Sequence, residues 1–122
     1  MLKFFNNCSN KNDKLIADVY QDLDLFYNSF FDNIYNELNI AKYKQIRDAV
    51  GLVMRKFDSH DHPLAYAGKL VMYIQSRVVL QHLHLTSFQQ KLLKNISDKT
   101  KHIDLNFVYS GPITDMQQFR TY

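Results

Sequence analysis

The chain has 122 residues, a formal net charge of +3 and 46% hydrophobic residues, which is the size and composition of one globular domain. With three glycines and two prolines it has too few turn residues for a β-sandwich, in which turns recur about every 8–12 residues. The single cysteine, Cys8, excludes an internal disulfide and favours the cytosol over an oxidising compartment.

The first part of the chain is expected to form an arm and one long helix. Residues 1–11 show no helical period, and their apolar stretch is too short for an export signal. From Asn12, apolar residues recur at spacings of three and four as far as Phe30, which indicates an amphipathic helix. The pattern weakens at residues 28–29, so two interpretations stay open: the helix continues toward Leu38, or it breaks there.

A second helix is predicted after residues 39–41, with an apolar stripe from Tyr43 to Phe57 and with Lys56 among its outward cations. Gly51 lies inside this helix, where glycine costs roughly 1 kcal/mol relative to alanine. We interpret it as a position at which a neighbouring helix approaches closely.

A third helix is predicted to follow the polar loop over residues 58–62. Pro63 suits its first turn, where the missing N–H is not needed, and the apolar stripe extends to about Leu83.

The fourth helix has the sharpest local signal. Thr86 and Gln89 form a capping box, in which each side chain bonds the backbone amide of the other residue. The apolar stripe then comprises Phe88, Leu92, Leu93 and Ile96. After about residue 100 the pattern fades, and residues 102–122 are too apolar for a free tail. We expect this tail to fold back partly on the helices or to become ordered on a partner.

Four amphipathic segments within residues 12–101 predict an all-α, antiparallel four-helix bundle with an irregular C-terminal tail. Residues 1–122 are therefore interpreted as a single domain. No apolar run approaches the ~18 residues of a membrane span.

No catalytic, cofactor or metal site is predicted, and neither an enzymatic activity nor a small-molecule substrate. His60 and His62 lack a third zinc ligand, because His82 and His84 lie at the other end of the third helix, about 30 Å away. We interpret all four as solvated histidines. Cys8 has no neighbouring histidine in sequence that would activate it.

The positive charge is concentrated in the second half, where residues 62–122 carry seven Lys/Arg against three Asp/Glu. A lysine cluster over residues 91–101 makes a small helical nucleic-acid-binding regulator the alternative function, although arginine is scarce there. Several aromatic residues of this half have no evident place on a core stripe, as is typical of protein-binding patches. They are Tyr66, Tyr73, Tyr109, Phe119 and Tyr122.

The stretch from Leu85 to Ser97 resembles the fourth-helix motif of the immunity proteins for pediocin-like (class IIa) bacteriocins. In that family an aromatic residue and Gln follow the capping Thr, and a Leu-x-x-Leu/Ile-Ser pattern comes next. The likeness covers residues 60–120, from the helix start at Pro63 to the tail with Tyr109 and Gly111. The first half is similar only in helix pattern and length.

The resemblance implies a cytoplasmic protein of a Gram-positive bacterium that protects the producer cell from its own pore-forming peptide. Its implied partner is the membrane permease of the mannose phosphotransferase system, bound from the cytosolic side once the bacteriocin has engaged it. Peripheral contact with the inner face of the membrane is left open, and no nucleic acid is expected. The partner-binding residues predicted on the fourth helix and tail are Lys91, Lys94, Asn95, Lys99, Lys101, Tyr109, Phe119 and Arg120.

Overall fold

The computed structural model describes residues 11–32, 35–36, 38–105 and 112–120. These residues form four α-helices and one short 3₁₀-helix, and no strand occurs among them. The expected all-α bundle is therefore confirmed, while the N-terminal arm lies outside the described residues. The helices are α1 (Lys11–Ser29), α2 (Ile40–Asp58), α3 (Pro63–Gln81), α4 (Ser87–Thr100) and η2 (Met116–Phe119).

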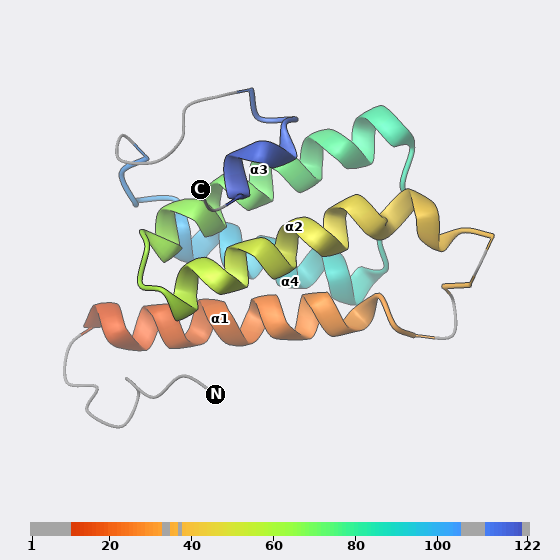
Figure 1. Ribbon diagram of the computed structural model, residues 1–122. Helices are drawn as coiled ribbons and strands as arrows, with labels where there is room; N and C mark the ends of the chain where they lie inside the picture. Colours follow the sequence, from red (N-terminus) through yellow and green to blue (C-terminus); the bar gives the residue numbers. More distant parts are fainter. Residues whose placement is uncertain (1–10, 33–34, 37, 106–111, 121–122) are drawn as a thin grey trace.

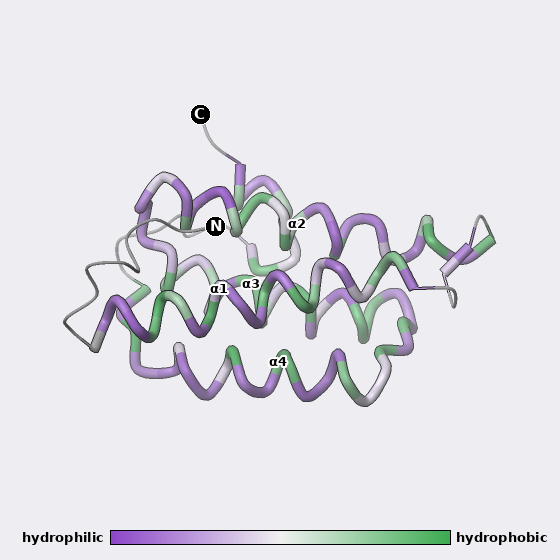
Figure 2. The backbone as a smooth tube through the Cα atoms, turned by 90° about the horizontal axis from the view of Figure 1, so that it is seen from below, coloured by the Kyte–Doolittle hydropathy of each residue, from purple (hydrophilic) through white to green (hydrophobic). Residues whose placement is uncertain are grey.

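Consecutive α-helices run antiparallel to each other (Figure 1). The bundle is closed because α1 packs against α4 as well as against α2. The α1–α2 and α3–α4 connections lie at one end of the bundle, and the α2–α3 turn lies at the other. Along each helix hydrophobic and hydrophilic residues alternate in short stretches (Figure 2), as expected for a helix with one buried stripe. The centre is filled by Val19, Leu23, Phe26, Ile46, Val53, Phe57, Leu70, Ile74 and Ile96.

The end of α1 resolves the question left open by the sequence. The helix stops at Ser29, whose hydroxyl donates to the Phe26 carbonyl at 2.6 Å. Phe30 then remains in the core, where its ring lies 5.4 Å from that of Tyr35. Leu38, in contrast, is 93% exposed and does not continue the apolar stripe. The helix ends here because Phe30 packs against Tyr35, which lies in the connection to α2.

The capping box of α4 is confirmed. The Gln89 amide donates to Thr86 Oγ1 at 3.1 Å, and the Thr86 amide donates to Gln89 Oε1 at 2.9 Å. The other end of the same amide group, Gln89 Nε2, donates to Ser29 Oγ at 2.9 Å and to the Tyr35 hydroxyl at 2.8 Å. One buried side chain therefore starts α4 and joins it to the end of α1.

The close approach expected at Gly51 is also confirmed. A Cβ atom built on this residue would lie 3.4 Å from Cε1 of Tyr27, so α1 and α2 are near each other here.

Part of the tail folds back on the bundle through η2, which packs against α2. The Phe119 ring is fully buried and meets the Tyr73 ring edge-on, with 5.5 Å between the centroids. Gln118 holds the preceding turn, since its Nε2 donates to the carbonyls of Ile113 and Asp115 at 3.1 and 2.8 Å.

Three of the aromatic residues interpreted as a protein-binding patch, Tyr66, Tyr73 and Phe119, are core residues. The interpretation was wrong for Tyr73 because η2 covers that side of α3, which the helix pattern alone does not reveal.

Candidate functional site

The middle of α4 presents three of the predicted partner-binding residues. Lys91 and Lys94 are exposed and Asn95 is half-buried. Lys94 Nζ lies 3.0 Å from Asp98 Oδ2, one helical turn later, and this hydrogen bond lowers the pKa of Asp98. The solvent-facing side of α4 therefore carries the exposed Lys91, the Lys94–Asp98 ion pair and the half-buried amide of Asn95.

The two other predicted lysines, Lys99 and Lys101, lie at the end of α4 and differ in their contacts. Lys99 Nζ lies 2.8 Å from Asp22 Oδ2, and both side chains are mostly covered. This ion pair links α4 to α1, so the charge of Lys99 is already neutralised within the bundle. Lys101, the residue that follows the helix, is exposed.

A groove of about 410 Å³ runs between α3 and α4. Its lining is mainly apolar, and Lys94 and Gln90 stand beside the apolar part. Val79 is the most exposed apolar residue here, with 73% of its surface accessible. The residues that line the groove are Gln75, Val78, Val79, Leu85, Gln90, Leu93, Lys94 and Ser97.

The sequence-based prediction did not include this groove in the site, although the sequence of residues 78–80 indicates exposed apolar surface. Residues 78–80 are three consecutive apolar residues at the end of α3, whereas a single buried stripe needs only one or two of them. The surplus apolar surface of Val79 lies in the groove.

Phe88 corrects the expected stripe of α4. It was predicted to face the core with Leu92, Leu93 and Ile96, but it is 52% exposed. Gln89 takes the core position in the first turn instead. Adjacent residues on a helix point about 100° apart, so Phe88 is turned away from the core.

The predicted tail residues do not join the α4 surface. Phe119 is a core residue with 0% exposure, so its prediction as a partner contact is wrong, because Tyr73 and α2 enclose its ring. Tyr109 lies outside the described residues. Arg120 is exposed, but it lines a second groove on another side of the bundle.

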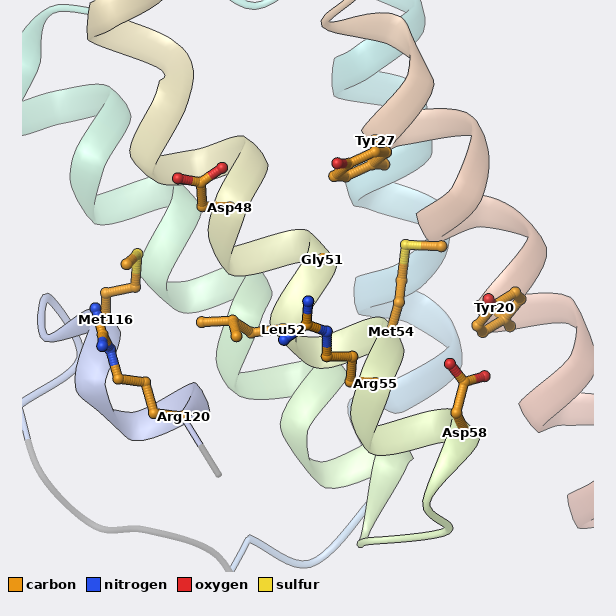
Figure 3. A pocket seen from close by; sticks show the side chains of 10 residues that line it. All are labelled: Tyr20, Tyr27, Asp48, Gly51, Leu52, Met54, Arg55, Asp58, Met116 and Arg120. Carbon is orange, nitrogen blue, oxygen red and sulfur yellow. The ribbon is translucent and has the colours of Figure 1, made fainter. Parts of the chain in front are cut away.

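This second groove has a volume of about 540 Å³ and crosses α2. Figure 3 shows Tyr20 and Tyr27 of α1 on one side of α2 and the tail residues Met116 and Arg120 on the other. Burial, and next the charge of Asp58, raise the pKa of Tyr20, which keeps its hydroxyl protonated. The lining contains two aspartates and two arginines, so its charges indicate no single class of ligand.

Lys56 fixes the end of the tail beside this groove. Its Nζ lies 3.3 Å from Asp61 Oδ2, donates to the Arg120 carbonyl at 3.5 Å, and stands 4.6 Å from the centre of the Tyr66 ring. The side chain was predicted to point outward but is buried, because the tail and the α2–α3 turn close over it. Hydrogen bonds from His62 and then from Lys56 lower the pKa of Asp61.

The predicted residues therefore occupy separate surfaces. α4 packs between α1 and α3, whereas η2 packs on α2, the helix across the bundle from α4. In the views of Figures 1 and 2, α4 and the tail lie on different sides of the bundle. The α4 lysines and Arg120 cannot contact one small epitope together.

Within the described ranges, no group of three or more His, Cys, Asp or Glu side chains is placed to hold a metal ion. None of the described helices is both long and apolar enough to cross a bilayer.

Comparison with known proteins gives one match. The model of the bacteriocin immunity protein family matches residues 18–101, which include nearly all of the four-helix bundle. No curated protein and no solved structure matches the chain. Because the family model covers more than half of the sequence, the chain belongs to the bacteriocin immunity protein family.

Proposed function

We propose that this protein confers immunity on a bacteriocin-producing Gram-positive cell by binding the membrane permease of the mannose phosphotransferase system from the cytosolic side. The permease would be recognised once the bacteriocin has engaged it, and binding would close the pore. Membership of the immunity family supports the protective role. The observation that supports a binding mechanism is the apolar groove between α3 and α4 with Lys94 at its side.

This groove has the composition of a protein-binding site. An apolar centre with a polar rim is typical of such sites, and Leu85, Leu93 and Val79 supply the centre. The rim is polar, since it consists of Gln90, Ser97 and Lys94, whose charge is balanced by Asp98. The groove therefore suits an apolar segment of a partner that is flanked by polar residues.

The groove of α2 and the tail is the weaker candidate. Its charges balance, and it is built in part from tail residues that follow the matched region 18–101. We assign the permease contact to α3 and α4, with Lys91, Lys94 and Asn95 as its polar residues and Lys101 at its edge.

The structure weakens the nucleic-acid alternative. Two of the four clustered lysines are engaged within the protein, Lys94 with Asp98 and Lys99 with Asp22. Phosphate binding by several free cations would give an affinity that falls steeply with salt. A gel-shift experiment at low and moderate salt separates this function from immunity.

Variants of the groove test the proposal in a sensitive host that expresses the protein. Val79→Asp places a charge on an exposed apolar contact, and Lys94→Gln removes a rim cation. We expect Val79→Asp to lower the tolerated bacteriocin concentration about tenfold, as loss of one central contact would. Lys14→Gln removes an exposed lysine of α1 and is the matched control.

Copurification with the permease, with and without bacteriocin, measures binding directly. Full protection and normal copurification with Val79→Asp would reject the groove as the contact surface. An exchange of residues 80–122 with those of a relative tests the same assignment more broadly, since the bacteriocin that is resisted should change with this segment.

A further inference from the structure

One end of the bundle carries most of the exposed large apolar side chains. Five of them lie within two residues of a helix end on the side of the α1–α2 and α3–α4 connections (Figure 1). We call four of these five the apolar tip: Phe31, Leu38, Leu80 and Phe88. Leu38 is 93% exposed, so its side chain is hardly covered by the rest of the protein. Val79 is close in sequence but belongs to the α3–α4 groove.

The opposite end of the bundle differs in kind. The α2–α3 turn there consists of Ser59, His60, Asp61 and His62, and the residues after α4 are Lys101 and His102. Among the described residues, no exposed large apolar side chain lies at that end. Figure 2 shows hydrophobic residues in the α1–α2 connection, away from the end at which α1 begins. The asymmetry runs along the long axis of the bundle.

Three exposed lysines lie near the apolar tip, and the exposed carboxylate of Asp32, which follows Phe31, lies there as well. Lys42 and Lys44 are exposed within the first five residues of α2, and Lys91 is exposed within the first five residues of α4. The first turns of both helices lack an acidic residue, although the helix dipole favours one there. An external anion at this end would interact favourably with the lysines and with both helix dipoles.

The nearby arginine at this end is occupied within the protein. Arg47 lies 5.4 Å from the centre of the Phe31 ring and 3.4 Å from Asp48 Oδ1. Arg47 therefore packs against the tip residue Phe31, while Lys42, Lys44 and Lys91 are exposed to solvent.

We propose that the apolar tip inserts into the interface of an anionic lipid membrane, with Lys42, Lys44 and Lys91 at the phosphate headgroups. The tip residues come from separate chain segments at one end of the bundle, while the two described grooves lie along helix faces. A fluid lipid surface accepts each protruding side chain separately, whereas a protein partner needs a matching cavity. Apolar side chains beside lysines are the composition of interfacial membrane-binding surfaces.

The chain offers a clean reporter, because it contains no tryptophan. Leu38→Trp places a single indole at the apolar tip, and Ile113→Trp places one at an exposed apolar position outside it. Vesicles of phosphatidylcholine with phosphatidylglycerol in equal parts are the probe, and pure phosphatidylcholine vesicles are the neutral comparison. We expect the emission of Leu38→Trp to shift to the blue with the anionic vesicles only, and that of Ile113→Trp to stay unchanged.

Vesicle flotation of the full chain measures affinity. Lys42→Gln together with Lys44→Gln should weaken binding to the anionic vesicles by about 20-fold or more, since each surface lysine contributes about fivefold. Leu38→Ser should weaken it as well, whereas Lys14→Gln should not. Equal binding by all variants, or no binding of the natural chain to anionic vesicles, would overturn the proposal.

The outcome is distinguishable from that of permease binding, because the vesicles contain no permease. Val79→Asp should still bind vesicles while losing protection. If Leu38→Trp shows no shift although Val79→Asp loses protection, the lipid proposal alone falls. If vesicle binding occurs but Val79→Asp protects fully, the groove assignment alone falls.

Discussion

Gln89 donates a hydrogen bond of 2.9 Å from its Nε2 atom to the hydroxyl of Ser29, and the two residues lie 60 positions apart. The same side chain accepts the bond that starts α4. A local capping motif thus also joins α4 to the end of α1, in the fully buried part of the bundle.

Gln89→Ala should therefore cost more than the loss of a cap. Removing Thr86 by Thr86→Ala should lower the free energy of unfolding by about 1 kcal/mol, the usual value for an N-cap. Gln89→Ala also leaves the Ser29 and Tyr35 hydroxyls without this partner, and we expect about 2–4 kcal/mol. Urea denaturation measures both, with the exposed Gln90→Ala as control. Equal losses for the two variants would show that the link to α1 adds nothing.

Gly51→Ala should stabilise the bundle. A methyl group there would meet Tyr27 Cε1 at 3.4 Å, which is a contact and not a clash. Alanine in a helix interior is favoured over glycine by about 1 kcal/mol, so we expect a gain of about 0.5–1 kcal/mol. Gly51→Leu should instead destabilise, because the larger side chain must displace Tyr27. Thermal unfolding compares the three proteins, and a loss with alanine would mean that α1 cannot yield at all.

Phe119→Ala should release the tail without unfolding the helices. Truncation of a buried phenylalanine costs about 3–5 kcal/mol, and here the cost falls on the docking of η2 over Tyr73. Amide hydrogen exchange of residues 112–120 should become fast, while helix content by circular dichroism stays nearly constant. Met116→Ala is the milder control, since Met116 is only partly buried. Unchanged exchange in Phe119→Ala would show that the tail is held by other contacts.

Acid should weaken the α2–α3 turn through Asp61. Because its pKa is below the ordinary value of 3.8, the folded state favours the carboxylate. The stability from this group is therefore complete above pH 5 and is lost as the pH falls through the lowered pKa. Its side chain is partly exposed, so the effect should be under about 1 kcal/mol.

Urea midpoints between pH 6 and pH 2.5 test this. Asp61→Asn should show a shallower decline than the natural chain over that range. Asp98→Asn is a useful comparison, because its carboxylate has a lowered pKa but lies on the surface of α4, away from the turn. An identical pH profile for Asp61→Asn and the natural chain would remove the role assigned to this carboxylate.

Local chemistry explains why the helices could be predicted. The capping box at Thr86, the proline at the start of α3 and the spacing of apolar residues each act within a few positions of the chain. α2 and α4 accordingly begin where the sequence indicates. The end of α1 could not be decided, since it depends on the ring of Phe30 meeting Tyr35 in the core.

The candidate site was only partly accessible from sequence. Lys91 and Lys94 are exposed as expected, because a polar residue off the apolar stripe faces solvent. Phe119 and Lys56 were assigned to the surface and are buried, because the returning tail covers one side of α2 and α3. The contact between Lys56 and the Arg120 carbonyl spans 64 positions, which no local pattern can indicate.

The sequence by itself determined four amphipathic helices, their order and the excess of cations in the second half, since these follow from residue type and spacing. Only the tertiary structure decided that the α4 lysines and Arg120 lie on separate surfaces, that the α3–α4 groove is open, and that four apolar residues gather at one end of the bundle. The physical reason is that the exposure of a residue depends on its neighbours in space. Helix packing and the docked tail bring those neighbours from distant parts of the chain.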